Sequence, residues 1–497
     1  MTDFKNKDLT KKEINKGMAK GAMWMMLFRL LDRSFGVAST IILARLLVPE
    51  DFGLVALATA VIAMLEILTT FSFDLALIQN PQAERKHFDT AWTFNILFAI
   101  SNAFLLLIFS GLAASFFEDP RLVEIMYVLA FGVFVSGFAN IGTVAFQKNL
   151  RFDQEFKFLL IKRAIAFLAT VILAFLLQNY WALVIGTVVS KVVGCILSYA
   201  IHPYRPRLCL QAAGELFHFS KWLVINNILI FAANRGGDFF IAKLAGPAQL
   251  GFFSVAYEIS NLPTTELVFP ISRAVFPGYA RMAAGSRDEL SNGYLEVFSL
   301  IALITIPAGV GIWVLATPLV EFLLGVKWLD AIPLIKLLAI FGILRACASN
   351  SGAAYLALGR PKIISFLSAF YVAVLFLSLL ILIPCYGLVG SAYAILIAAT
   401  VQMPVSYGIL LKNLNIPLKV FLGKIWRPIT ASLIMALITR ETIEISTYIG
   451  MPVSLVLILG VLSGVFSYFF CLFTLWFFLR RPIGSETTLL NLWQKRA

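Results

Sequence analysis

Long apolar stretches follow one another along almost the whole chain and are separated by short polar segments. Because an α-helix needs about 20 residues to cross the hydrocarbon core of a bilayer, the pattern predicts about fourteen membrane-spanning helices. The expected spans are 21–47, 53–78, 90–116, 122–146, 156–177, 181–200, 218–244, 249–279, 292–320, 329–357, 363–383, 387–411, 425–440 and 451–479. The chain is therefore expected to be an all-α polytopic membrane protein.

Composition agrees with this fold class. Of the 497 residues, 60% are hydrophobic and 13% are charged, and the mean hydropathy of +0.88 is far above that of soluble domains. The formal net charge of +13 would suggest nucleic-acid binding in a soluble protein. Here the basic residues lie mostly in short loops, so no nucleic-acid partner is expected.

The distribution of basic residues predicts the orientation. Every second loop carries Lys or Arg, as at Arg85, Arg205 and Arg360, whereas the alternate loops around Asn179 and Cys385 carry almost none. Cytoplasmic loops are enriched in Lys and Arg. Both termini are therefore expected in the cytoplasm, which also agrees with an even number of spans.

An internal repeat appears at an offset of 198 residues, where 44–53 (ARLLVPEDFG) matches 242–251 (AKLAGPAQLG). A weaker match relates 140–142 to 350–352. The Pro-x-x-x-Gly pattern could be turn chemistry alone. Because both segments are expected at the same face of the membrane, however, we favour two six-helix lobes in parallel pseudo-repeat, plus two C-terminal helices, with a central cavity and alternating access.

This organisation predicts the following parts. They are a cytoplasmic N-terminal arm at 1–20, an N-lobe at 21–200, a cytoplasmic linker at 201–217, a C-lobe at 218–411, two additional spans at 412–479 and a cytoplasmic tail at 480–497.

Charged residues inside the spans are the candidate site. A charge near the centre of a membrane helix costs roughly 2.5–3.5 kcal/mol and persists where it faces a wet cavity or a partner. The cations expected to bind an anionic substrate are Arg29, Arg33, Lys191, Arg235 and Arg345. An internal salt bridge that fixes helix packing is the alternative for Arg29 and Arg33 with Asp32. Each of the cations Lys191, Arg235 and Arg345 could instead be a packing partner for Glu66 or Glu258.

The carboxylates inside spans are candidates for ion coupling or for charge pairing, because low dielectric favours their protonated form. They are Asp32, Glu66, Asp74, Asp238 and Glu258. Lys162 and Arg163 are interpreted as reaching to the membrane interface. Trp181, Trp328 and Trp426 are expected in the interfacial belt, and Gly460 with Gly464 is expected to pack helices within the bundle.

No cofactor or metal is predicted. The five cysteines and three histidines show neither a disulfide framework nor a zinc-ligand spacing, and the sequence contains no Gly-rich nucleotide-binding loop. No loop exceeds about twenty residues, whereas a membrane-embedded polymerase or transferase usually needs a larger extramembrane part or paired catalytic carboxylates. The chain is therefore not expected to be an enzyme.

Several segments resemble the Wzx-type polysaccharide flippases, which belong to the multidrug/oligosaccharidyl-lipid/polysaccharide exporter superfamily. Among these flippases, the segments are most similar to the colanic-acid-type exporters. The segments are 44–53, 76–79, 147–152, 234–238, 251–257, 261–263 and 276–277. The resemblance covers most of the chain to about residue 411. Each motif alone is weak, but their order and spacing are specific to the branch, though not to a substrate.

The resemblance implies translocation of undecaprenyl-pyrophosphate-linked oligosaccharide repeat units across the bacterial cytoplasmic (inner) membrane, for exopolysaccharide, capsule or O-antigen assembly. A polysaccharide polymerase and chain-length machinery are candidate partners beside the lipid-linked substrate and the bilayer. A peptidoglycan lipid-precursor flippase and a multidrug/cation antiporter of the same superfamily remain alternatives. The Arg-rich set favours an anionic substrate over a cationic drug.

Overall fold

The computed structural model describes residues 11–69, 73–79, 83–262, 268, 275, 278–279, 281–283 and 285–478. The tail at 480–497 and the motif at 276–277 lie outside these residues, and the arm at 1–20 is described only from residue 11. Within the described ranges every regular element is a helix. The all-α fold class is confirmed.

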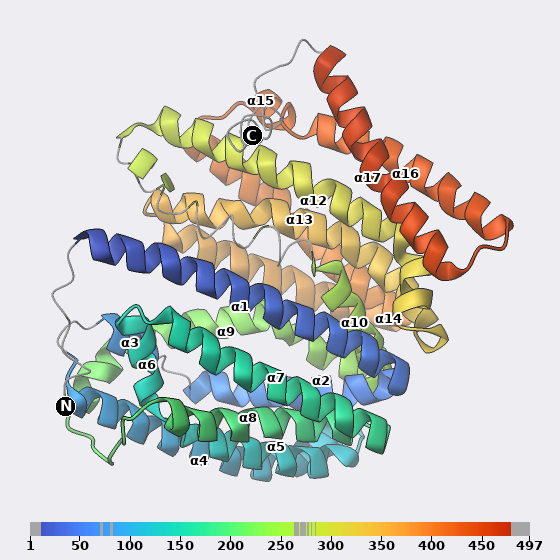
Figure 1. Cartoon of the computed structure of the whole chain (residues 1–497). Helices are drawn as coiled ribbons and strands as arrows, with labels where there is room; N and C mark the ends of the chain where they lie inside the picture. The colour runs from blue at the N-terminus through green and yellow to red at the C-terminus, as the bar shows by residue number, and fades with distance from the viewer. Residues whose placement is uncertain are drawn as a thin grey trace. The chain divides into compact units, whose positions relative to one another are not determined.

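The chain divides into two compact units, Met1–Gly251 and Phe252–Ala497. The lobe boundaries expected from the repeat stay a prediction. The helices of the first unit, drawn from blue to green in Figure 1, are α1 (Lys11–Leu46), α2 (Pro49–Thr69), α3 (Phe73–Gln79), α4 (Arg85–Phe117), α5 (Arg121–Gly137), η1 (Ile141–Thr143), α6 (Val144–Lys148), α7 (Phe152–Leu177), α8 (Trp181–Ile201) and α9 (Ala213–Ala245). Helix α10 (Pro247–Ser260) begins in this unit and ends in the second.

The second unit continues in yellow to red. Its helices are α12 (Arg287–Leu323), η3 (Val326–Ala331), α13 (Ile332–Ala357), α14 (Pro361–Leu414), α15 (Leu418–Leu422), α16 (Trp426–Tyr448) and α17 (Val453–Phe478). A buried aromatic core that includes Tyr294, Phe298, Tyr355 and Tyr407 joins α12, α13 and α14.

Eight helices of the described part are long and apolar enough to cross a membrane, or nine if the pair Arg121–Gly137 and Ile141–Lys148, bent by 63°, is one span. The expected total of about fourteen spans is not confirmed by this measure. Helices α1, α2 and α9, which carry Arg29, Glu66 and Arg235, are not among the eight. Lys191 and Arg345, by contrast, lie on α8 and α13, which are among the eight.

Helix α14 contains 54 residues, about 81 Å at 1.5 Å per residue, which is too long for one crossing. It breaks at Gly387, where φ is 57° and ψ is −138°. A Cβ atom added at Gly390 would lie 2.1 Å from the carbonyl oxygen of Leu382, so the chain folds back tightly here. The break separates the expected spans 363–383 and 387–411.

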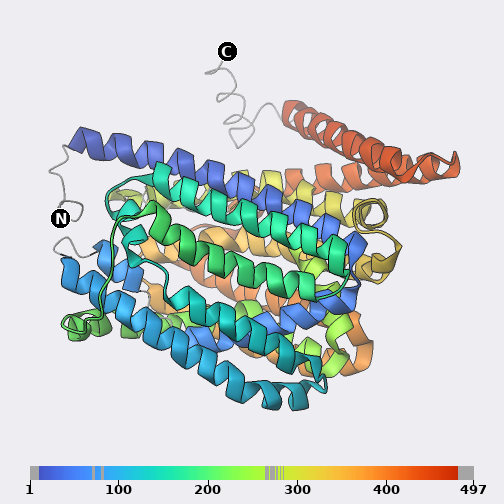
Figure 2. The same ribbon diagram turned by 60° about the horizontal axis from the view of Figure 1, so that its bottom comes forward.

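Figures 1 and 2 both show α7 lying beside α1 and α8 in the first unit. In the second unit α16 and α17 form a helical hairpin that packs on α12. An added Cβ at Gly460 would lie 2.7 Å from Leu315, and one at Gly464 would lie 3.1 Å from Thr439. The two glycines thus pack within the bundle, as expected.

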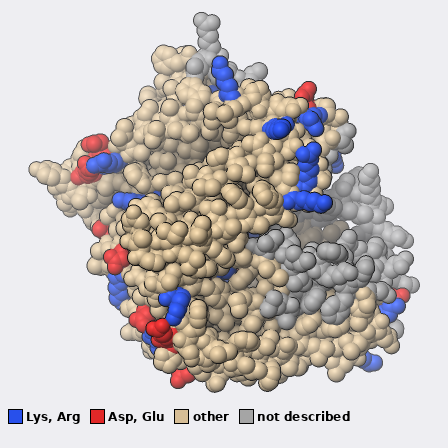
Figure 3. Space-filling view, turned by 180° about the vertical axis from the view of Figure 1, so that it is seen from behind, with Lys and Arg blue, Asp and Glu red and all other residues tan. Residues whose placement is uncertain are grey.

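The face drawn in Figure 3 shows Lys, Arg, Asp and Glu mostly toward the left and right sides of the view, with other residues covering most of the described surface between them. Trp426 is 41% exposed, but Trp328 is fully buried in η3 against Phe252. The expectation that Trp328 belongs to an interfacial belt is wrong, because the 3-10 turn directs its ring into the core.

Candidate functional site

Charged side chains from four helices of the first unit form two partly exposed ion pairs. Asp32 of α1 forms an ion pair with Arg163 of α7, with 2.8 Å between Oδ1 and Nε. The side chains of Arg163 and Asp32 are 40% and 43% exposed. Arg163 thus contacts α1 through this ion pair, a partner that the interfacial interpretation did not include.

Lys191 of α8 and Glu66 of α2 form the second pair, with 3.2 Å between Nζ and Oε1. Their side chains are 25% and 39% exposed. Two residues predicted separately, one as a substrate cation and one as a coupling candidate, are therefore neighbours. Partly exposed charges within apolar helices indicate a hydrated surface, since contact with lipid would be costly.

Arg29 and Arg33 lie four residues apart on the continuous helix α1, and so share a face. The Arg29 side chain is exposed and Arg33 is half-buried. Asp32, which lies between them in sequence, is directed to Arg163.

Arg235 and Asp238 are i,i+3 neighbours on α9, with 3.4 Å between Nη1 and Oδ2. The Arg235 side chain is 54% exposed, whereas Asp238 is 10% exposed. The guanidinium therefore extends outward from a carboxylate that is itself buried.

Arg345 of α13 lies in an aromatic cradle in the second unit. Its Nη1 donates a hydrogen bond to the hydroxyl of Tyr257 on α10. Its guanidinium also lies 6.0 Å from the ring centre of Tyr257 and 5.9 Å from that of Phe341. Cation–π contacts of this kind hold a planar guanidinium in a defined orientation. The sequence did not indicate Tyr257 or Phe341.

The remaining two candidate carboxylates are on α3 and α10. Asp74 is exposed on the short helix α3, which begins after α2 has ended at Thr69, so the single span expected at 53–78 is two helices. Glu258 is half-buried on α10, next to Tyr257.

The segment between α8 and α9 is held by polar residues that were not expected from the sequence. The hydroxyl of Tyr204 donates to Asp89 at 2.6 Å, and the backbone N–H of Arg207 donates to the same Oδ1 at 2.9 Å. The N–H of Cys209 donates to Thr93 at 2.9 Å. Asp89 and Thr93 are four residues apart at the start of α4, so polar residues at that spacing before an apolar run were the available signal.

The two repeat segments meet each other reciprocally. A Cβ at Gly53 would lie 1.6 Å from the carbonyl oxygen of Pro247, and a Cβ at Gly251 would lie 1.8 Å from that of Pro49. The starts of α2 and α10 therefore approach backbone to backbone, and each approach needs a residue without a side chain. Close by in sequence, Lys243 at the end of α9 pairs with Glu118 at 2.8 Å.

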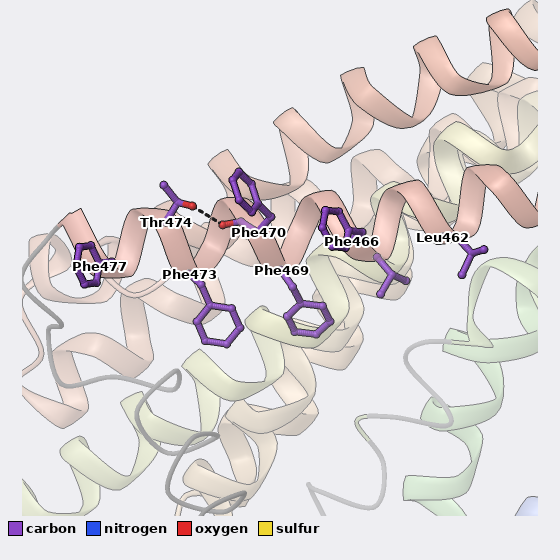
Figure 4. Close-up of a pocket in the computed structure, with 8 residues that line it drawn as sticks. Leu462, Phe466, Phe469, Phe470, Phe473, Thr474 and Phe477 are labelled. Carbon is purple, nitrogen blue, oxygen red and sulfur yellow. Dashed lines mark hydrogen bonds between the residues drawn. The ribbon is translucent and has the colours of Figure 1, made fainter.

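The final helix presents an apolar surface. Figure 4 shows the phenylalanine side chains of α17, among them Phe466 and Phe470, which are 75% and 64% exposed. The hydroxyl of Thr474 donates a hydrogen bond to the backbone carbonyl oxygen of Phe470, at 2.7 Å. A groove of about 530 Å³ between α12, α16 and α17 is also mostly apolar. Such surfaces fit contact with the lipid chains of a bilayer.

The family model of polysaccharide biosynthesis proteins matches residues 42–333. The teichuronic acid biosynthesis protein TuaB of Bacillus subtilis (strain 168) is 23% identical, over 92% of this chain and 96% of that protein. The lipopolysaccharide biosynthesis protein WzxC of Escherichia coli (strain K12) is 22% identical, over 83% and 85%. The succinoglycan biosynthesis transport protein ExoT of Rhizobium meliloti (strain 1021) is 23% identical, over 67% and 68%.

Solved structures show the same fold. The lipid II flippase MurJ, in an inward closed conformation, superposes with a TM-score of 0.72 at 14% identity, covering 92% of this chain and 99% of that one. A multidrug resistance MATE family transporter in an inward-facing conformation gives a TM-score of 0.62 at 17% identity, covering 78% and 98%. With its membrane-spanning helices and a family match over more than half its length, the chain belongs to the polysaccharide biosynthesis protein family.

Proposed function

We propose that this protein is a flippase that moves undecaprenyl-pyrophosphate-linked oligosaccharide repeat units across the bacterial cytoplasmic membrane by alternating access. The observation that carries the proposal is the set of partly exposed cations within otherwise apolar helices of a chain from this family. A pyrophosphate does not cross hydrocarbon unaided, and fixed cations in a hydrated cavity compensate its charge. Relatives named for teichuronic acid, lipopolysaccharide and succinoglycan biosynthesis support a saccharide cargo.

In this proposal the substrate-binding cations are Arg29, Arg33, Lys191, Arg235 and Arg345. Arginine is suited to phosphate because its planar fork can donate two parallel hydrogen bonds. Three carboxylates, Asp32, Glu66 and Asp238, act as charge partners, since each forms an ion pair with a neighbouring cation. Asp74 and Glu258 remain the candidates for ion coupling.

A deletion strain tests the function in cells. We expect loss of the surface or secreted polysaccharide and accumulation of lipid-linked repeat units on the inner leaflet of the cytoplasmic membrane. Loss of polymer alone is insufficient, because loss of a polymerase would have the same effect. Repeat units exposed normally on the outer leaflet of the deletion strain would contradict the proposal.

Purified protein in proteoliposomes separates the alternatives. Undecaprenyl-pyrophosphate-linked oligosaccharide should be translocated, whereas preferential translocation of a peptidoglycan lipid precursor would favour that flippase class instead. Proton- or sodium-driven export of a cationic dye, without translocation of either lipid, would favour the drug antiporter.

A further inference from the structure

Lys162 is a mid-helix cation that the proposed set of binding residues does not include. It lies ten residues after Phe152, the first residue of α7, so about 15 Å along a helix that continues to Leu177. This helix is one of the eight that are long and apolar enough to cross a membrane. Lys162 is half-buried. Its side chain lies against α8, which makes a simple extension to the membrane interface a poor explanation.

Its ammonium group lies against α8 beside Lys191. A Cβ added at Gly194 would lie 3.3 Å from Nζ of Lys162 and 3.0 Å from its Cε. Gly194 is three residues after Lys191 on the same helix and so shares its face. Lys162 and Lys191 are close enough to repel each other electrostatically.

The local charges do not balance. Glu66 pairs with Lys191, while Asp32 pairs with Arg163. Within the described part of the chain, no carboxylate forms an ion pair with Lys162. Among the described residues, Glu66 thus pairs with one of the two lysines, and an uncompensated positive charge inside an apolar span is costly.

We propose that Lys162 and Lys191 together form an anion subsite that takes the pyrophosphate of the lipid-linked substrate. This inference rests on the proposed function. Each ammonium offers three donors and a compact charge, so the pair can contact both phosphates, while Glu66 holds Lys191 when substrate is absent. The glycine at position 194 leaves the Lys162 side chain room against α8.

Binding of undecaprenyl pyrophosphate to the full-length protein in lipid nanodiscs is the direct test. Lys162→Gln should weaken binding about ten- to a hundredfold, since hydrogen bonds to charged groups contribute about 1.5–3 kcal/mol. The same substitution should weaken the binding of undecaprenyl monophosphate less, because a single phosphate needs fewer contacts. Lys157→Gln is the matched control, because Lys157 is an exposed lysine on the same helix, and it should bind as the wild type does.

Glu66→Gln distinguishes a binding role from a structural one. If Glu66 competes with the substrate for Lys191, its neutralisation should tighten pyrophosphate binding severalfold, which loss of a structural ion pair would not do. Lys162→Arg should keep most of the affinity for undecaprenyl pyrophosphate. It serves as the second variant if thermal unfolding shows that Lys162→Gln folds poorly.

Wild-type affinity and transport in Lys162→Gln would overturn the subsite while leaving the proposed function intact. Weaker binding in Glu66→Gln, equal to that of Lys162→Gln, would also overturn it. If the wild type neither binds undecaprenyl pyrophosphate nor translocates the oligosaccharide lipid, the proposed function itself fails.

Discussion

At the scale of single residues, charges inside apolar helices are held by specific partners that come from other helices. Asp32 and Arg163 join α1 to α7, and Lys191 and Glu66 join α8 to α2. Removing one member of such a pair leaves the other uncompensated, which costs more than the pair contributes. Substitutions at these positions therefore need charge-conserving controls before loss of transport is assigned to lost binding.

Arg345 offers the clearest residue-level prediction, because its cradle is defined. Arg345→Ala should reduce transport in proteoliposomes about ten- to a hundredfold, through loss of a charged contact with pyrophosphate. Arg345→Lys should restore it only in part, since lysine keeps the charge and loses the planar fork. Tyr257→Phe should reduce it about three- to tenfold, because the ring stays and the hydroxyl contact with Arg345 is lost.

Combining the substitutions tests whether Tyr257 acts through Arg345. Residues that share one contact are not additive. Tyr257→Phe should thus have no further effect in the Arg345→Lys background. Independent, multiplying effects on the apparent KM would show that Tyr257 contributes in another way.

Asp89 supports a separate prediction about the linker. Asp89→Ala leaves Tyr204 and the N–H of Arg207 without their acceptor, and Asp89 is only 6% exposed. We expect the free energy of unfolding to fall by about 1.5–3 kcal/mol. Trypsin should also cleave faster after the exposed Arg207, which gel electrophoresis would measure. Glu124→Ala, at an exposed carboxylate of α5, is the control. Equal cleavage of the two variants would show that the hydrogen bonds to Asp89 do not hold this segment in place.

At the scale of elements, hydropathy located helices more reliably than it located their ends and partners. The spans around α7, α8 and α17 match because their apolar runs are long and bounded by polar residues. The partners of Asp32, Lys191 and Arg345 could not be predicted, because pairing depends on which helices pack together. Trp328 and Arg163 show the same limit, since a residue's place along a span does not fix the direction of its side chain.

The reciprocal approach of α2 and α10 predicts a steric effect. Gly53→Ala or Gly251→Ala would place a Cβ within 2 Å of a proline carbonyl oxygen, so the two backbones must separate. Both variants should lower the melting temperature of the purified protein and reduce transport. At Gly111 no atom lies within 4 Å of an added Cβ, so Gly111→Ala should be neutral or slightly stabilising. Equal melting temperatures for all three variants would contradict the close approach.

The connection between α4 and α5 predicts a dependence on pH. The hydrogen bond that Arg121 donates to Asp119 holds the pKa of this carboxyl below its usual value. The hydrogen bond from Lys243 lowers the pKa of Glu118 in the same way. A carboxyl whose pKa is lower in the folded state contributes stability above its unfolded pKa, about 3.9 for Asp, and loses it as the pH falls further. The melting temperature should therefore drop below about pH 4, and Arg121→Gln should show a shallower drop.

At the scale of the whole molecule, the loops that carry basic residues set the expected orientation of the chain in the membrane. If the positive-inside rule applies, positions 205, 281 and 360 face the cytoplasm, and positions 50 and 179 face outward. The contact of Gly53 with Pro247 would then lie at the outer ends of α2 and α10. In the proposed function this contact then lies on the side where cargo is released, so orientation and mechanism are linked.

Labelling of single cysteines in intact cells tests that orientation. The five native cysteines are free and should first be replaced. A membrane-impermeant maleimide should label Glu50→Cys and Asn179→Cys in intact cells, but Arg205→Cys, Arg281→Cys and Arg360→Cys only after permeabilisation. The opposite pattern would put the contact of α2 with α10 at the cytoplasmic face. That contact would then be passed when cargo enters, and the glycine substitutions should impair substrate loading before they impair its release.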